Sequence, residues 1–314
     1  MRHAYLIIAH NNFGQLKQLI KLLDSENHDI YVHIDKKSKS FIEKDFINLT
    51  YKSRVYFFQE YEVFWGGFSQ VQVELFLFEK AHEQKYDYYH LISGGDLPVK
   101  SNRDIDAFFD KNRGKEFVLY DEKKLKNDPE ISRRARYYHF LQNYRRRYSQ
   151  KWKNSFFTFC ERVLLVLQII LHVNRVKNLD WTIKYGSNWV SITNDLVDEI
   201  LKQKEKIENI FSCTNCADEL FVQTVAYNCG FKDKIYHSEE GMTENVRLID
   251  WGRGRNGNPY TFRKQDYQFL CENKNLFARK FSETVDREII ELICTEIQKK
   301  NENISQNYYC SKGD

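Results

Sequence analysis

The sequence predicts an α/β protein with a mostly parallel central sheet, flanking helices and a basic helical insertion. In the first third of the chain, short runs rich in β-branched residues alternate with segments of helical periodicity, which is typical of β-α-β units. Of the 314 residues, 42% are hydrophobic, while only 13 are Gly and 3 are Pro, so a disordered or collagen-like chain is excluded. A stretch rich in arginine and aromatic residues breaks this rhythm, which resumes near residue 181.

Each element follows from a local pattern. Apolar runs predict strands at residues 4–9, 29–34, 55–58 and 86–92, and apolar residues three and four apart predict helices at 13–23 and 69–82. Beyond the insertion we expect a strand near 189–192, helices at 196–204 and 218–227, and a C-terminal helix from residue 286.

Polar clusters directly follow three of these strands. They are HNN at 10–12, DKK at 35–37 and SGGD at 93–96. Because ligands of parallel sheets bind at the carboxyl ends of the strands, the clusters indicate a nucleotide-sized site at one edge of the sheet.

The insertion is strongly basic, although the formal net charge of the whole chain is only +4. Residues 131–160 include no acid, and their cations are Arg133, Arg134, Arg136, Arg145, Arg146, Arg147, Lys151 and Lys153. Aromatic residues such as Tyr148 are interleaved, and the apolar run at 163–171 is too short to span a bilayer. Such a stretch can bind single-stranded nucleic acid, form a solvated helical face or contact an anionic membrane, and we favour the membrane.

The seven cysteines are irregularly spaced, which indicates reduced thiols. The apolar run near the N-terminus is shorter than that of a signal peptide, so we expect a cytoplasmic protein, peripheral on the inner face of the plasma membrane if the insertion binds lipid. Cys213 and Cys216, with Cys229 and His237 downstream, do not have the spacing of a standard zinc site.

The familiar phosphate-binding loops are missing from the sequence. The only D-x-D, Asp104-Ile105-Asp106, reads as the start of a helix, where side chains two residues apart diverge and cannot share an ion. A nucleotide-sugar site usually needs either a metal held by an acidic D-x-D or cationic side chains in place of the metal.

Eight segments in order resemble the core-2/I-branching enzyme family, glycosyltransferase family 14, which also contains the peptide O-xylosyltransferases. They are AYLIIAHN (4–11), YVHIDKKS (31–38), VFWGGFSQVQVEL (63–75), YDYYHLISGGDLPVK (86–100), GSNWVSIT (186–193), ADELF (217–221), PYTFRKQD (259–266) and LFARKF (276–281). The basic insertion matches poorly. The resemblance implies a GT-A-like fold and metal-independent, inverting transfer from a UDP-sugar to a hydroxyl, so we expect no cofactor and no divalent metal.

The resemblance also implies roles for individual residues. Glu219 matches the catalytic base, and its expected place in the first turn of the 218–227 helix would favour the ionised carboxylate. Arg263 and Lys280 match the pair that binds the diphosphate, although the neighbouring cations Lys264 and Arg279 leave the register open by one residue.

The remaining expected contacts surround the donor and acceptor. Asp35 matches the acid that contacts uridine, and His10 is a second expected nucleotide contact. The expected contacts to the donor sugar or acceptor are Trp65, Gly66, Asp96 and Asp218. His33 lies between apolar neighbours and is expected to be packed rather than catalytic.

These features predict a single glycosyltransferase domain over residues 1–314. Its parts are a nucleotide-sugar-binding half (1–122), the insertion (123–180) and an acceptor-side, catalytic half (181–314). The donor expected from the family majority is UDP-N-acetylglucosamine, with UDP-xylose and UDP-galactose as alternatives, and the acceptor is a glycan that can be lipid-linked. We expect a bacterial enzyme of surface polysaccharide synthesis that binds no nucleic acid; the alternatives of another class are a nucleic-acid-binding protein and a non-catalytic sugar-binding protein.

Overall fold

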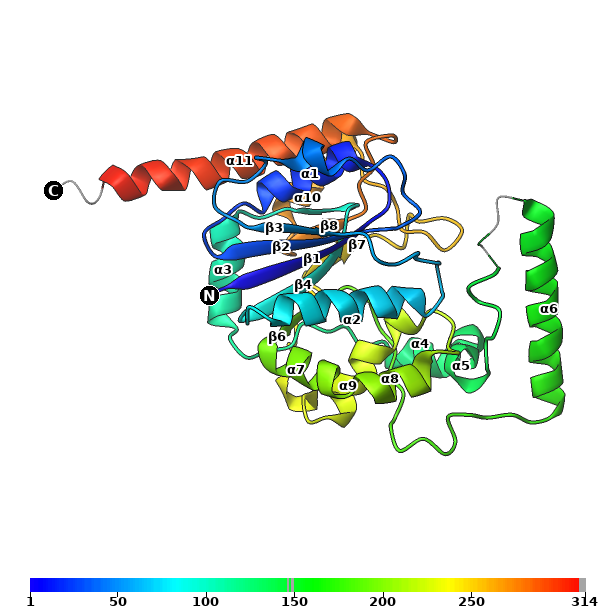
Figure 1. Cartoon of the computed structure of the whole chain (residues 1–314). Helices are drawn as coiled ribbons and strands as arrows, with labels where there is room; N and C mark the ends of the chain where they lie inside the picture. Colours follow the sequence, from blue (N-terminus) through cyan, green and yellow to red (C-terminus); the bar gives the residue numbers. More distant parts are fainter. Residues whose placement is uncertain (146, 148–149, 311–314) are drawn as a thin grey trace.

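The computed structural model describes residues 1–145, 147 and 150–310, the last eight by their backbone alone. Arg146 and Tyr148, which the sequence places in the basic stretch, lie outside the described residues. The fold is mixed α/β, with a central, mostly parallel sheet between two layers of helices, as the sequence predicts (Figure 1).

The large sheet has the strand order β3-β2-β1-β4-β6. Its strands are β1 (His3–Ala9), β2 (His28–Ile34), β3 (Val55–Phe58), β4 (Tyr88–Ser93) and β6 (Ser191–Thr193). The first four run parallel to their neighbours, with His3 opposite His28 on one side and Tyr88 on the other, and β6 pairs with β4 in the antiparallel sense. The predicted strands are therefore confirmed, with their ends shifted by at most two residues.

A second, small sheet was not predicted. It consists of β5 (Asp96–Pro98), β8 (Phe277–Arg279) and β7 (Arg247–Ile249), in the order β5-β8-β7. None of the three lies in an apolar run that would indicate a strand, as β6 does, and the three meet only in the tertiary structure. The small sheet brings residues near 280 to the end of β4.

Helices cover both faces of the large sheet (Figure 1). One face carries α1 (Phe13–Leu22), α3 (Asn102–Lys111), α10 (Tyr267–Glu272) and α11 (Arg287–Cys310), and the other carries α2 (Ser69–His82), α7 (Asn194–Lys202), α8 (Lys204–Phe211) and α9 (Phe221–Asn228). Two of the helices predicted beyond the insertion need correction. The helix expected at 196–204 is two helices, α7 and α8, and the one expected at 218–227 is a separate 3-10 turn, Ala217–Glu219, followed by α9.

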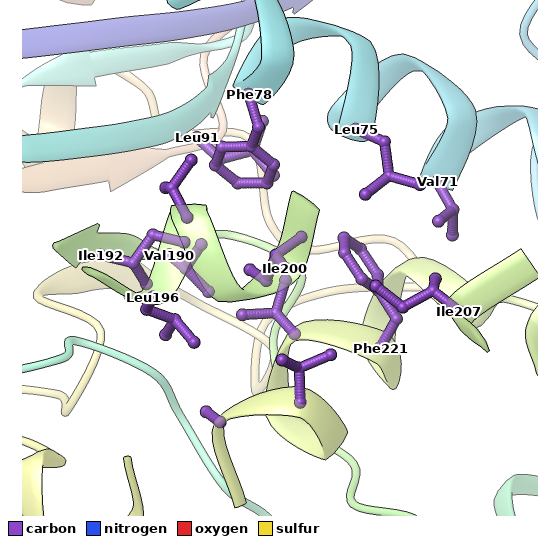
Figure 2. Packing of buried hydrophobic residues seen from close by; sticks show 14 of the residues in the cluster. Val71, Leu75, Phe78, Leu91, Val190, Ile192, Leu196, Ile200, Ile207 and Phe221 are labelled. Carbon is purple, nitrogen blue, oxygen red and sulfur yellow. The ribbon is translucent and has the colours of Figure 1, made fainter. Parts of the chain in front are cut away.

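Alternation along the buried strands produces two apolar cores. In β1, Ala4 and Leu6 face the core under α2 and α7–α9, while Tyr5 and Ile7 face the core under α1 and α11. Figure 2 shows the first core, where Val71, Leu75 and Phe78 of α2 lie above side chains of β6 and α7–α9. Because both faces of these strands are covered by apolar groups, polar groups of the strands collect at their ends.

The insertion contains α4 (Glu122–Asn127), α5 (Pro129–Arg136) and α6 (Lys151–Ile170). α4 and α5 lie near α8, whereas α6 stands at the edge of the molecule (Figure 1). Within the described part of the chain, none of the helices combines the length and the apolar character needed to cross a bilayer.

Candidate functional site

The carboxyl ends of β1 and β2 bring the two expected nucleotide contacts together. Asp35 directly follows β2; its N–H donates to the carbonyl of Ala9 (2.9 Å), and its Oδ1 accepts from the N–H of Lys37 (2.9 Å). Burial lowers the pKa of the His10 imidazole; the charge of Asp35 opposes this effect, and those of Lys37 and Lys280 add to it. His10, Asp35 and Lys280 therefore share one electrostatic environment.

Lys280 reaches this edge because the segment 279–282 is fixed against the ends of β1 and β4. The N–H of Phe281 donates to the carbonyl of Gly95 (2.8 Å), and the buried side-chain amide of Gln15 donates to the carbonyl of Phe281 (3.3 Å). These contacts hold the backbone directly after Lys280 at the point where the sequence places the diphosphate.

The two alternative cations, Arg279 and Lys264, both have a carboxylate partner. Arg279 forms an ion pair with Asp96 (2.9 Å), and Lys264 forms one with Glu288 (2.5 Å). Burial, followed by the charge of Arg279, lowers the pKa of the Lys280 ammonium. No carboxylate among the described residues forms an ion pair with Lys280, so its ammonium is available to an anion.

Arg263 lies on a segment that runs beside Lys280. The N–H of Phe262 donates to the carbonyl of Lys280 (2.9 Å), and the N–H of Lys280 points to the carbonyl of Tyr260 (3.4 Å). The Arg263 side chain is exposed. The two residues expected to bind the diphosphate thus come from adjacent segments, and their binding role remains a prediction.

Asp96 supports Arg279 in this structure. Its Oδ2 accepts from the N–H of Ser93 (3.0 Å), and its Oδ1 accepts from the Ser93 hydroxyl (2.8 Å) and the Arg279 guanidinium (2.9 Å). The residue is 2% exposed, and the Arg279 guanidinium lies 4.2 Å from the ring centre of Trp189. Asp96 therefore anchors the segment that carries Lys280, while the expected contact with a sugar remains a prediction.

The Trp65-Gly66 loop lies directly against the loop that carries the candidate base. The N–H of Cys216 donates to the carbonyl of Gly66 (2.9 Å). Gln70 joins both loops, because its side-chain oxygen accepts from the N–H of Gly66 and its nitrogen donates to Asp218 Oδ2 (2.9 Å). Gly66 has a φ of +75°, which favours glycine, and Trp65 is 58% exposed; their expected contact with a sugar remains a prediction.

Glu219 is paired with an arginine that the sequence assigned only to a basic surface. Its Oε2 forms an ion pair with Arg134 Nη1, and its carbonyl accepts from the N–H of Gly186 (3.0 Å). The expected position of Glu219 in the first turn of a helix is wrong, because the backbone of Leu220 is not helical and α9 starts at Phe221. The charge of Arg134 on α5, rather than a helix N-terminus, lies next to the carboxylate.

Two further carboxyl groups lie behind Glu219. Burial, and then the charge of Glu219, raises the pKa of Asp218 to about 7. Glu74 on α2 is 1% exposed, and burial followed by the charge of Asp218 raises its pKa well above the usual value. Glu219, with 28% of its side chain exposed, is the member of this cluster that substrate can reach.

Contacts join the nucleotide side of the site to the side that carries the base. Lys37 Nζ lies 3.4 Å from Asp35 Oδ2 and 4.1 Å from the ring centre of Phe64, which adjoins the Trp65-Gly66 loop. On the opposite side, the segment 186–189 makes both contacts. The N–H of Gly186 donates to the carbonyl of Glu219, and the indole of Trp189 lies under the Arg279 guanidinium. Two surface hollows lie elsewhere, one at the amino ends of β1 and β4 and one beside α3 and α10, and no predicted site residue lines either.

Sequence reasoning missed three residues of this site. Arg134 gave no signal, because it is one of many cations in the insertion. Gln70 and Glu74 had a signal that could have been used: they lie four residues apart on α2, and Glu74 falls among Val71, Leu75 and Phe78 on the apolar face. An acid on the apolar face of a predicted helix indicates a buried polar cluster.

One group of side chains resembles a metal site. His3, His28 and Asp106 place their ligand atoms within 4.8 Å of one another at the amino ends of β1 and β2, away from the candidate site. His28 Nε2 and Asp106 Oδ1 are 2.7 Å apart, a hydrogen-bond distance, whereas two ligands of one tetrahedral zinc stand about 3.3 Å apart. The group is therefore better described as a hydrogen-bonded network. Asp106 belongs to the D-x-D motif. The other acid of that motif, Asp104, accepts a hydrogen bond from the Ser101 hydroxyl at the start of α3 (2.6 Å).

Comparisons with known proteins identify a family model and several relatives that match this chain. The model of the family described as "Branch: Core-2/I-Branching enzyme" matches residues 3–273. The chain is similar to xylosyltransferase 2 of Rattus norvegicus (23% identical over 326 residues, 93% of this chain and 33% of that protein) and of Homo sapiens (24% over 319 residues, 93% and 33%). It is also similar to xylosyltransferase sqv-6 of Caenorhabditis briggsae (25% over 312 residues, 89% and 34%). The chain spans about a third of the length of these relatives.

Among solved structures, the crystal structure of mouse xyloside xylosyltransferase 1 in its apo form matches with a TM-score of 0.38 and 10% sequence identity. The match covers 88% of this chain and 96% of that one.

The buried carboxyl pair predicts a pH dependence of stability. The pKa of Asp218 rises from 3.8 to about 7 on folding, so between these values the folded state binds more protons than the unfolded chain. The free energy of unfolding should therefore fall as pH rises from about 4 to about 7, by at most about 4 kcal/mol from this group. Asp218→Asn should flatten that fall in urea titrations, and Glu74→Gln should act in the same direction.

Asp233→Asn provides the control, because Asp233 is exposed. A wild-type pH profile in Asp218→Asn, matching that of Asp233→Asn, would contradict the assignment.

Proposed function

The chain belongs to the Core-2/I-Branching enzyme family, and we propose that it is a glycosyltransferase that moves a sugar from a UDP-sugar to a hydroxyl of a glycan. The observation that carries the proposal is the placement of Glu219. Its carboxylate is partly exposed and held by Arg134, and the backbone of its loop is bonded to Gly66 and to Gly186. A carboxylate fixed in this way is suited to take a proton from an incoming hydroxyl.

The proposed chemistry is a single displacement. The acceptor oxygen attacks the anomeric carbon on the face opposite UDP, the bond between that carbon and the diphosphate oxygen breaks, and the acceptor proton passes to Glu219. One such displacement inverts the anomeric centre. Arg134 would orient the Glu219 carboxylate, while Gln70 holds the neighbouring Asp218 in place.

The leaving diphosphate gathers negative charge, which nearby cations can stabilise. Lys280 lies at the carboxyl edge without a carboxylate partner among the described residues, and Arg263 lies on the adjacent segment. Asp35 and His10 would contact the nucleoside on the same side. Metal independence is part of this proposal; its support is that both acids of the only D-x-D are engaged within the fold, one at the N-terminus of α3 and one by His28.

The donor sugar is the least determined part of the proposal. The family majority favours N-acetylglucosamine, the relatives named above are called xylosyltransferases, and galactose remains an alternative. We propose UDP as the shared nucleotide and a glycan as the acceptor. A panel of these three UDP-sugars, scored for thermal stabilisation and for slow release of UDP, identifies the donor. A cytoplasmic role in bacterial surface polysaccharide synthesis completes the proposal.

Replacing the candidate base tests the chemistry. Glu219→Gln retains the size of the side chain but cannot accept the proton, so kcat for UDP release in the presence of acceptor should fall by about 10²–10⁴-fold. Activity of the wild type should persist in EDTA. Turnover of Glu219→Gln within tenfold of the wild type would contradict the role of this residue.

Replacing the cations tests diphosphate binding. Lys280→Ala and Arg263→Ala should each lower kcat/KM for the UDP-sugar by about 10²–10³-fold, because each removes a charge that stabilises the leaving group. Lys264→Ala is the matched control, since Lys264 is exposed and paired with Glu288. If Lys264→Ala is as damaging as Arg263→Ala, the one-residue register is wrong.

Removing Arg134 tests the positioning of the base. Arg134→Ala should lower kcat roughly 10–100-fold and leave KM for the UDP-sugar nearly unchanged, because the guanidinium contacts Glu219 and not the donor side. The neighbouring Arg133 is exposed, and Arg133→Ala should behave as the wild type. A rise in KM with unchanged kcat would assign Arg134 to substrate binding instead.

A further inference from the structure

α6 turns its apolar side to solvent. Six apolar side chains spaced four and three residues apart line one side of the helix, and between 42% and 67% of each is exposed; they are Trp152, Phe156, Phe159, Val163, Val166 and Ile170. We call these residues the α6 stripe. On the segment bonded to the other side of α6, the exposed rings of Tyr138 and Phe140 stack with centroids 5.5 Å apart. Surface helices normally show the opposite arrangement.

The polar side of α6 faces the protein and fixes the orientation of the helix. Glu161 is 1% exposed; its Oε1 lies 2.9 Å from His139 Nδ1, and its Oε2 accepts from the N–H of Leu141 (3.1 Å). Gln168 accepts from the N–H of Tyr138 (2.8 Å) and donates to the carbonyl of the same residue (2.9 Å). Rotating the helix to bury the stripe would break all four contacts, so the apolar side is held outward.

The charge around the stripe has one sign. Lys151, Lys153 and Arg162 flank it, and Arg133, Arg136 and Lys177 are further cations of the same region. Among the described residues of the segment 131–179, the only acid is Glu161, which is buried. A surface that combines exposed apolar side chains with unbalanced positive charge is complementary to an anionic one that has an apolar interior.

We propose that the α6 stripe docks on an anionic lipid membrane, with α6 lying in the plane of the interface. The apolar side chains would enter the boundary between headgroups and acyl chains, and the flanking lysine and arginine side chains would contact the headgroups. A second copy of the chain fits less well, because pairing two stripes would bring cations against cations with no exposed acid between them.

Hydrogen bonds connect the segment that holds α6 to the loop that leads to the candidate base. The N–H of His139 donates to the carbonyl of Cys213 (2.8 Å), and the side-chain amide of Gln142 donates to the carbonyl of Ser212 (2.7 Å). These contacts join the segment under α6 to the loop that leads to Glu219. If the proposed function holds, on which this consequence rests, docking presents Glu219 to an acceptor carried on a lipid.

Vesicle sedimentation with the full chain tests the docking. The wild type should sediment with vesicles of phosphatidylglycerol and phosphatidylcholine at low salt, and much less with phosphatidylcholine alone or at high salt. Phe159→Glu/Val163→Glu should lower the bound fraction about tenfold, and Lys151→Glu/Arg162→Glu should lower it similarly on anionic vesicles. The matched control is Ile47→Glu/Tyr51→Glu, which adds the same charge at residues 64% and 93% exposed outside the insertion.

Several results would overturn the proposal. The first is that the wild type does not sediment with anionic vesicles, and the second is that the Phe159→Glu/Val163→Glu variant binds them as well as the wild type does. The third is a dimer in solution that this variant converts to a monomer, which would show that a second copy covers the stripe. Thermal unfolding and UDP release of the variants should match the wild type, which shows that they fold. A chain that releases UDP but ignores vesicles would refute docking alone, and one that binds vesicles but never releases UDP would refute the proposed function alone.

Discussion

Burial of the parallel strands on both faces is the constraint on which the rest of the structure depends. Strands β1, β2 and β4 send alternate side chains into two apolar cores, so the polar groups that substrate chemistry needs lie where the strands end. The carboxyl ends collect His10 and Asp35 directly. The small sheet and the buried amide of Gln15 then bring a distant part of the chain, with Lys280, to the same edge. The candidate site is therefore a consequence of how this sheet is covered.

The buried acidic cluster behind Glu219 is compatible with an ionised Glu219 carboxylate. Asp218 and Glu74 lie behind it with pKa values raised by burial, so at neutral pH and below they tend to hold their protons rather than repel the Glu219 carboxylate. Arg134 supplies a cation in contact with that carboxylate. The insertion therefore has two different sides. Through α5 it reaches the proposed chemistry, and through α6 it presents an apolar, cationic surface to whatever lies outside the protein.

Much of the fold could be predicted because periodicity is a local property. The strands of the large sheet and helices such as α2 were predicted to within two residues at either end, since buried strands and amphipathic helices have distinct spacings of apolar residues. The short strands β5, β7 and β8 and the break before α9 were not. No apolar run marks these strands in the sequence, and tertiary contacts hold the loop that precedes Phe221. The segments of the family resemblance supplied the candidates Glu219, Arg263 and Lys280, which local patterns alone would not distinguish from surface charges.

The sequence by itself determined the α/β class, the edge at which the polar clusters meet, and the basic, aromatic character of the insertion. Only the tertiary structure decided that Arg134 contacts Glu219, that Arg279 is taken by Asp96 while Lys280 is not, and that α6 faces outward with its apolar side. The physical reason is the range of the interactions. Apolar periodicity acts between residues three or four positions apart, whereas ion pairs and buried carboxyl clusters join segments that are distant in the chain and become neighbours only when the cores close.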